Sequence, residues 1–241
     1  MNQSALYNLS YGLYVLGTRD NGRYAGCVVN TVVQATSKPV TVTVCVNLDN
    51  YTNACIKKSK EFSVSILSEG VKENVFGIFG FSSSKDRDKF GEVPHGFTPG
   101  GLPYLTEGVT GFLECRVINS IDNFTHTIFI AEVIGAENLP NQNGQNDPPM
   151  TYAYYHKTVK GKTPKNAPGF SAVPPAMAAS GATANNTAGG KTGSKADGSY
   201  KCGVCGYVFT GSAEEFKKLP LDFVCPVCGA AKSKFEEIKN G

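Results

Sequence analysis

The chain has 241 residues, of which 41% are hydrophobic, and a formal net charge of +3 at pH 7. Because its 23 basic and 20 acidic residues form no long runs of one sign, the composition favours no nucleic-acid partner. No apolar run of about 18 residues predicts a membrane span, and no charged segment followed by an apolar one predicts a signal peptide at the N-terminus.

Strand signals dominate the first 140 residues, where runs rich in Val, Ile, Thr and Phe recur. In chain order, the sequence predicts a helix over Ser4–Tyr14, strands over Tyr24–Thr36 and Val40–Asn47, a helix over Tyr51–Ser59, a strand over Phe62–Leu67, a helix over Val71–Phe79, and strands over Val109–Ile121 and Thr125–Glu137. Many strands with few, short helices do not form βαβ units. The expected fold class is therefore mainly β, with an antiparallel barrel or curled sheet.

Residues 171–198 contain no aromatic residue, leucine or isoleucine. Such a segment cannot bury enough apolar surface to offset its ordering entropy, so a flexible linker is predicted over residues 169–198. A linker of this composition has a root-mean-square span of roughly 30 Å. It separates a first domain, residues 1–168, from a C-terminal domain, residues 199–241.

The C-terminal domain contains two cysteine pairs, Cys202-Gly-Val-Cys205 and Cys225-Pro-Val-Cys228. Two such pairs supply the four thiolates of a tetrahedral site, which selects zinc or iron. The spacing does not choose between these metals, because 19 residues between the pairs also suit a zinc site. Two disulfides are a third interpretation. The remaining cysteines, Cys27, Cys45, Cys55 and Cys115, are isolated and are expected to be small buried hydrophobes.

Aromatic residues flank both cysteine pairs and are expected to form a core around the sulfurs: Tyr200, Tyr207, Phe209, Phe223 and Phe235. With these flanks, residues 199–241 resemble rubredoxin, a one-iron electron carrier. The resemblance implies one iron per chain with Cys202, Cys205, Cys225 and Cys228 as its four ligands. The loop between the pairs is about ten residues shorter than in ordinary rubredoxins, and Phe223 stands where these often carry tryptophan.

Seven motifs follow one another in the first 168 residues: Tyr11–Val15, Gly26–Gln34, Asn50–Thr52, Ser83–Phe90, Gly111–Cys115, His126–Val133 and Tyr154–Lys157. This series resembles the flavin reductase-like family, in particular its flavoredoxin and ferric-reductase branch. The resemblance implies a split β-barrel, a homodimer, and FMN held near the dimer interface. Together with the linker and tail, the whole chain resembles the high-molecular-weight rubredoxins of anaerobes.

The family resemblance also implies site residues. Asn30 and Thr31 stand beside the isoalloxazine with Gln34 on the same segment, while Thr36 and Ser37 stand near the ribityl–phosphate end. Asn47 and Thr52 are expected on the phosphate side, and His126 near the flavin and nicotinamide. Lys85 and Lys89 fall in a basic loop, where ammonium groups suit a phosphate as point charges. This loop departs from the family at Ser84 and Lys85, and Ala131 replaces a common glycine.

The resemblance implies an oxidoreductase that takes electrons from NADH or NADPH through FMN to a rubredoxin-type iron. From there they pass to a soluble acceptor such as a flavodiiron protein. A cytoplasmic location is expected, because thiolates reserved for metal fit a reducing compartment. Two alternatives stay open: an FMN and iron shuttle reduced by a partner protein, and a non-enzymatic zinc-ribbon interaction protein.

Overall fold

The computed structural model describes residues 9–140, 147–159, 199–202, 207, 209, 211–225 and 231–238. Its strands are β1 (Tyr14–Asp20), β2 (Arg23–Val29), β3 (Val32–Ser37), β4 (Val40–Asn47), β5 (Glu61–Leu67), β6 (His95–Phe97), β7 (Pro103–Leu105), β8 (Val109–Asn123), β9 (His126–Asn138), β10 (Ser199–Cys202) and β11 (Phe235–Ile238). Its helices are α1 (Tyr51–Ser59), α2 (Asn74–Phe81), α3 (Tyr152–Tyr154), α4 (Ala213–Lys218), and the short turns η2 (Phe90–Glu92), η3 (Tyr155–Val159) and η4 (Lys232–Lys234).

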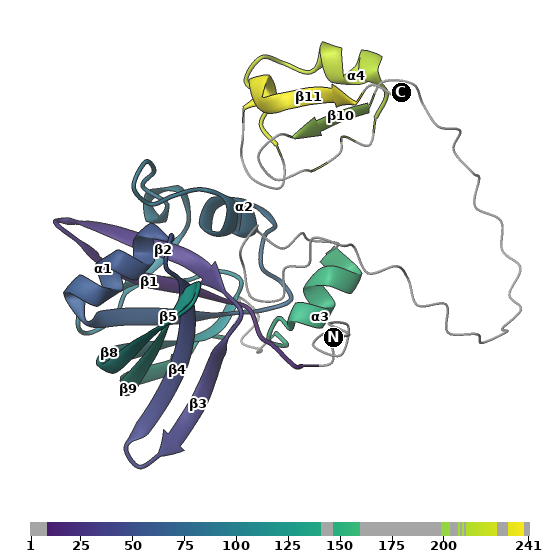
Figure 1. The fold of residues 1–241 in the computed structure, drawn as a ribbon. Coiled ribbons are helices and arrows are strands. Elements are labelled where there is room, and N and C mark those ends of the chain that lie inside the picture. Colours follow the sequence, from purple (N-terminus) through teal and green to yellow (C-terminus); the bar gives the residue numbers. More distant parts are fainter. Residues whose placement is uncertain are drawn as a thin grey trace, which may run out of the picture.

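Seven antiparallel strands form one curled sheet in the order β2-β1-β5-β8-β9-β4-β3 (Figure 1). Breaks in register along β8 mark bulges, which increase strand twist and curl the sheet. One core fills the concave side, and it draws buried residues from six strands and α1: Leu16, Cys27, Val29, Val42, Val44, Val46, Ile56, Phe62, Val64, Cys115, Phe129 and Ala131. We call β1–β9 with α1–α3 the barrel domain. The expected mainly β class is confirmed.

Most of the predicted elements are present. The strand over Val40–Asn47 and the helix over Tyr51–Ser59 have the predicted bounds. The prediction over Tyr24–Thr36 merges two strands, β2 and β3, which a turn at residues 30–31 separates. The helix predicted over Ser4–Tyr14 lies partly outside the described residues. Where it is described it is wrong, because residues 9–13 are not helical and Tyr14 begins β1.

A second core lies between β1, β2 and β5 on one side and α2 with η2 on the other. Gly26 allows this close packing, since a Cβ there would lie 2.9 Å from the Phe90 ring and 3.0 Å from the Phe79 ring. Phe79 and Phe90 pack edge to face, with ring centroids 5.0 Å apart. Helix α2 is therefore held directly against β2 (Figure 1).

The C-terminal module comprises β10, α4, η4 and β11, and its two strands pair in antiparallel fashion. Its core is a small cluster of Cys202, Phe216, Cys225 and Phe235. All five aromatic residues predicted to surround the sulfurs belong to this cluster or pack against it. Ser212 and Glu215 form a capping box that fixes the start of α4 and so places Phe216.

Within the described part of the chain, no helix combines the length and hydropathy needed to cross a membrane.

Candidate functional site

Several of the predicted flavin contacts meet at one end of the barrel. Asn30 and Thr31 follow β2, Asn47 ends β4, Thr52 lies in the first turn of α1, and His126 begins β9. Asn47 is paired directly with His126 in the β4–β9 register. The Thr31 hydroxyl accepts a hydrogen bond from the Cys45 N–H at 3.2 Å, which holds this turn against β4. The fold thus brings five of the predicted residues to the same edge.

Side-chain hydrogen bonds of Asn50 and Asn53 hold the start of α1 at this edge. Asn50 caps α1, because its Oδ1 accepts from the Thr52 N–H at 3.0 Å. The buried Asn53 side chain donates to the Val46 carbonyl at 3.0 Å and to the Thr127 hydroxyl at 2.9 Å. The start of α1 is therefore tied to the ends of both β4 and β9. The sequence reasoning missed Asn50 and Asn53 in this role, although asparagine directly before a helix is a capping signal.

Two buried polar atoms at this edge lack partners among the described residues. They are the Thr52 hydroxyl oxygen and His126 Nε2. A buried polar atom without a hydrogen bond costs free energy, so two of them at this end of the barrel fit a site for a polar ligand. The His126 Nδ1 lies 2.8 Å from the Thr125 hydroxyl, which orients the ring. Partial burial lowers the pKa of His126, which favours the neutral imidazole at pH 7.

The α1 N-terminus adds electrostatic character to the same edge. A helix N-terminus carries a partial positive charge and N–H groups that suit an anion. The first turn of α1 contains no acidic side chain that would offset this charge. Beneath it, the buried Cys27 thiol faces Thr52 and Asn50, and burial raises its pKa to about 11. Thr52 is therefore part of a helix end that favours anions, and the neutral Cys27 thiol beside it adds no negative charge.

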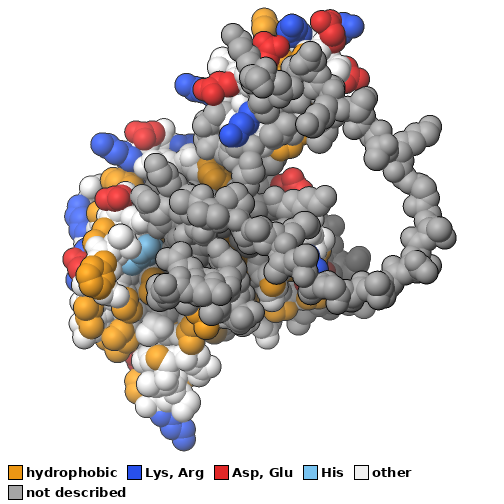
Figure 2. All heavy atoms as spheres, turned by 45° about the vertical axis from the view of Figure 1, so that its right-hand side comes forward, with side chains coloured by type: hydrophobic (Ala, Val, Ile, Leu, Met, Phe, Trp, Pro, Cys, Tyr) orange, Lys and Arg blue, Asp and Glu red, His pale blue; other side chains and the backbone are white. Residues whose placement is uncertain are grey.

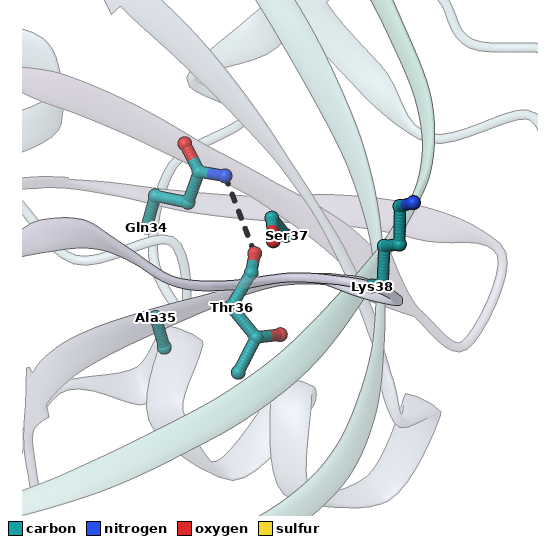
Figure 3. Close-up of a pocket in the computed structure, with 5 residues that line it drawn as sticks. All are labelled: Gln34, Ala35, Thr36, Ser37 and Lys38. Atoms are coloured by element: carbon teal, nitrogen blue, oxygen red, sulfur yellow. Dashed lines mark hydrogen bonds between the residues drawn. The ribbon is translucent and has the colours of Figure 1, made fainter.

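The other predicted contacts, Gln34, Thr36 and Ser37, lie at the far end of the β3–β4 hairpin. With Ala35 and Lys38 they line an open hollow (Figure 3). Thr36 pairs with Thr41, six residues along β4 from Asn47, which corresponds to about 20 Å. One phosphate cannot contact both groups within one protomer. The two groups therefore lie apart within one chain, and the assignment of Thr36, Ser37, Asn47 and Thr52 to the phosphate end stays a prediction.

Hydrogen bonds within the hairpin also occupy these side chains. The Thr36 hydroxyl bonds to the Pro39 carbonyl at 2.5 Å and to the Thr41 hydroxyl at 2.6 Å. Gln34 Nε2 donates to the Thr36 carbonyl at 3.2 Å (Figure 3). These bonds stiffen the tip of the hairpin.

The two lysines of the predicted basic loop differ in position. Lys85 is exposed, as expected for a surface charge. Lys89 is only 2% exposed, and its ammonium donates to the Gly26 carbonyl at 2.9 Å and the Phe79 carbonyl at 3.4 Å. Lys89 is thus buried, and its bonds brace β2 against α2. Burial lowers its pKa to about 8. Its contact with a phosphate stays a prediction.

The predicted metal ligands are only partly described. Cys205 and Cys228 lie outside the described residues, and Cys202 and Cys225 are both buried in the core of the module. Backbone contacts close the chain on either side of each pair. The Cys202 N–H donates to the Tyr207 carbonyl at 2.7 Å, and a bridge joins Val224 to Ala231. Two buried cysteines, each at the start of a closed loop, fit a thiolate metal centre.

Phe216 completes this centre and was missed in the sequence. Its ring stacks on Tyr200 with centroids 4.1 Å apart and packs on Phe235 at 4.9 Å. Lys232 lies over the same ring and donates to the Lys217 and Leu219 carbonyls at the end of α4. The capping box Ser212–Glu215 ahead of an apolar residue is the sequence signal that indicates this helix.

A family model, "Flavin reductase like domain", matches residues 6–162. The chain belongs to the flavin reductase-like family. The match ends seven residues before the linker start predicted at residue 169. Every predicted flavin contact falls inside the matched range.

Three relatives extend this finding. The high molecular weight rubredoxin of Moorella thermoacetica is 38% identical over 248 positions, covering 99% of this chain and 100% of the relative. The ferric-chelate reductase (NAD(P)H) of Archaeoglobus fulgidus is 39% identical and covers 69% of this chain and 96% of its own length. Rubredoxin-2 of Chlorobaculum tepidum is 41% identical over 49 positions, covering 16% of this chain and 94% of the relative.

The rubredoxin match also bears on the shortened loop. Its 49 positions correspond to 16% of this chain, which is about 39 residues, so about ten positions have no counterpart here. This agrees with the shorter segment between the cysteine pairs. The flavin reductase-like domain and the rubredoxin-like module together identify a flavoprotein of electron transport with a metal-binding module.

Proposed function

We propose that this protein passes electrons from NADH or NADPH through FMN to a single iron held by Cys202, Cys205, Cys225 and Cys228, and on to a soluble acceptor. The observation that carries the proposal is the union of the two sites in one chain. The barrel has a polar edge with two buried atoms that lack partners among the described residues, and the module has two buried cysteines, Cys202 and Cys225. When bound, FMN can exchange electrons in pairs with a nicotinamide and singly with iron.

The residues at the barrel edge bind and orient rather than transfer protons. The Thr52 hydroxyl and the α1 N-terminus are suited to the phosphate, and Asn30 and Thr31 to the ring edge. His126, neutral and held by Thr125, presents Nε2 to the ring or to the nicotinamide. Hydride transfer needs alignment of the two rings, which such fixed side chains supply.

The donor assignment is supported by the name of the Archaeoglobus relative, which includes NAD(P)H. The iron assignment is supported by the Moorella relative, which is named as a rubredoxin and matches nearly the whole chain. A flavodiiron protein that reduces oxygen or nitric oxide would be a fitting acceptor, because it takes electrons from soluble one-electron carriers. Thiolate ligation suits the reducing cytoplasm.

We also propose a homodimer. Apolar side chains are exposed along the neighbouring strands β8, β9, β4 and β3, namely Ile118, Ile121, Ile134, Val40 and Val33. Figure 2 shows hydrophobic side chains at the surface of the barrel domain. Apolar surface that runs across adjacent strands indicates a protein interface. A dimer would also let the hairpin tip of one protomer approach the site of its partner.

Anaerobic absorption spectra before and after NADH addition test the proposal. The purified protein is expected to show flavin and ferric-thiolate bands, and NADH should bleach both. Metal analysis that finds zinc and no iron in anaerobically prepared protein would favour the zinc-ribbon alternative. If dithionite bleaches both bands and neither NADH nor NADPH does, the protein is a shuttle reduced by a partner.

A matched pair of threonine variants tests the flavin site. Thr52→Val removes a hydroxyl that lies beside the weakly hydrogen-bonding Cys27 thiol, so we expect weaker FMN binding, by about tenfold, with little loss of stability. Thr18→Val removes a hydroxyl that donates to the Glu61 carbonyl at 2.7 Å, so we expect a loss of about 1 kcal/mol in stability with FMN affinity unchanged. Equal FMN affinity in wild type and Thr52→Val would exclude Thr52 from the site.

A further inference from the structure

Helix α2 leaves one aromatic side chain outside the barrel core. The helix ends at Phe81, and this half-buried side chain packs against the core cluster of the C-terminal module. The module lies on the same side of the barrel domain as α2 (Figure 1). We propose that the C-terminal end of α2 is the docking site of the chain's own metal module, and that the iron receives its electrons there. This inference rests on the proposed function.

The composition of α2 supports a covered position on more than one side. Its eight residues, Asn74 to Phe81, include no charged side chain, and five of them are buried in the barrel domain. A helix that is apolar all round is covered by protein on most of its surface. The core of the barrel covers Val75, Phe76 and Phe79, which leaves Phe81 at the free end of the helix. The aromatic cluster of the module is a matching apolar surface.

The docking site is also connected to the flavin edge by direct packing. Phe79, two residues before Phe81, packs over Gly26 in β2, and Lys89 bonds to the carbonyls of both. Strand β2 then leads through Cys27, whose thiol faces Thr52, to Asn30 at the proposed flavin site. Gly26 and Asn30 are four residues apart, which is about 13 Å along a strand. A module docked at Phe81 is therefore linked by packing to β2, the strand that leads directly to Asn30.

Docking at Phe81 leaves a different surface of the module exposed. Leu221 is 94% exposed and Val224 is 51% exposed, and both lie within four residues of Cys225. Apolar side chains of this kind beside a metal ligand suit contact with a second protein. The docked module can thus receive electrons on one side while it presents Leu221 and Val224 to the acceptor.

Tryptophan fluorescence tests the docking without any substrate. The chain contains no tryptophan, so Phe81→Trp introduces a single indole at the proposed contact. Phe124→Trp is the matched control, because Phe124 is 97% exposed in the β8–β9 turn. Ferric thiolate absorbs near the emission of indole and quenches it at short range, whereas zinc does not. Each full-length variant is therefore compared in its iron-loaded and zinc-loaded forms.

We expect emission from the Phe81→Trp protein to be several-fold weaker with iron than with zinc, and emission from the control to be the same with both metals. Equal emission from Phe81→Trp in the two metal forms would overturn the docking site. Because this measurement needs no NADH, it reports on docking even if the proposed electron donor is wrong.

Stopped-flow absorbance then tests the role of docking in electron transfer. Phe81→Ser should slow iron reduction by about tenfold after the flavin is reduced, since the module loses its local attachment. The rate of flavin reduction by NADH should not change, and Phe81→Leu should restore most of the iron step. If Phe81→Ser reduces iron at the wild-type rate, the module does not depend on this contact. If NADH reduces no flavin in the wild type, the proposed function fails and the docking result stands separately.

Discussion

The two parts of the chain are held together by different means. The barrel domain buries two extensive clusters of aliphatic and aromatic side chains, on the concave side of its sheet and beneath α2. Among the described residues of the C-terminal module, the core consists of four buried residues, two of which are the cysteines Cys202 and Cys225. A domain of some 40 residues rarely stabilises itself by burial alone, and a structural metal commonly supplies the difference. The barrel should therefore fold without its cofactor, and the module only with its metal.

This difference is also a difference in function. A site that is built on a stable barrel keeps its geometry when the ligand leaves, as the bonds of Asn50 and Asn53 at the barrel edge indicate. A module that folds around its metal is folded when the metal is bound and unfolded when the metal is lost. The pair suits the proposed function, in which the flavin contacts are preorganised and the iron is carried by a small module on the predicted linker.

The largest expected effect comes from Cys225→Ser, which replaces a proposed ligand within the small core. Structural zinc in zinc-finger peptides contributes about 10–16 kcal/mol, and a contribution of this order from the metal means that the variant should lose its metal and unfold the module. The barrel should keep its FMN and its melting temperature. Metal analysis, flavin content and thermal unfolding followed by circular dichroism measure all three.

The matched control is Cys45→Ser, a half-buried cysteine of β4 in the barrel domain. The Cys45→Ser protein should keep the wild-type metal content. A Cys225→Ser protein that retained a full complement of iron would contradict both the ligand assignment and the contrast between the two parts.

The second largest effect is expected when the barrel is destabilised and the metal module is left intact. Phe129 is fully buried in the barrel core, so Phe129→Ala should lower the stability of the barrel by about 3–5 kcal/mol. Phe124→Ala removes an exposed ring and should change it by less than about 0.5 kcal/mol. The ferric-thiolate absorbance should persist through the lowered barrel transition. A loss of iron at the same temperature as the barrel melts would show that the two parts unfold as one unit.

Sequence patterns predicted the strands where local and tertiary preferences agree. The alternation of Val40–Asn47 and the asparagine before Tyr51 both match what the fold uses. The helix over Ser4–Tyr14 was wrong at its end, because pairing of β1 with both β2 and β5 overrides local preference. A signal for this hairpin was present in Asn21-Gly22, whose positive φ angles of 45° and 86° form its two-residue turn.

The site was predictable in its residue types and less so in its geometry. Asn30, Thr31, Asn47, Thr52 and His126 meet at one edge because β4 pairs with both β3 and β9, and the sequence alone does not show this register. The burial of Lys89 was not predictable either, because it depends on the packing of α2 over Gly26. Cysteine spacing, in contrast, is local, and therefore it indicated the metal module directly.

The third prediction concerns pH and belongs to the barrel alone. Burial lowers the pKa of Lys89 from 10.5 to about 8, so between these values the unfolded chain binds more protons than the folded one. Stability contributed by this group is therefore lowest below pH 8 and rises with pH, by about 1 kcal/mol between pH 8 and 9. In denaturant unfolding across that interval, the stability of the wild type should rise by this amount relative to Lys89→Met, and Lys58→Met, at an exposed position, should follow the wild type.

The interval must end near pH 9 because buried thiols act in the opposite direction. Burial raises the pKa of Cys27 to about 11 and that of Cys115 to about 12, so the folded state binds more protons than the unfolded state above pH 9. Stability contributed by these thiols falls as pH increases further. If wild type and Lys89→Met show the same slope from pH 8 to 9, Lys89 is not a buried ammonium in the folded protein.

The smallest expected effect concerns the predicted linker, residues 169–198, which lies outside the described residues. Residues 171–198 have no apolar pattern that would bind to either part, so their sequence should matter less than their length. Scrambling them at constant length should leave NADH-driven iron reduction nearly unchanged. Cutting them to about five residues limits the reach to roughly 17 Å, and this should slow either the step from flavin to iron or the step from iron to acceptor. Stopped-flow absorbance of flavin and iron separates these steps, and a scrambled protein as slow as the shortened one would mean that the segment makes specific contacts.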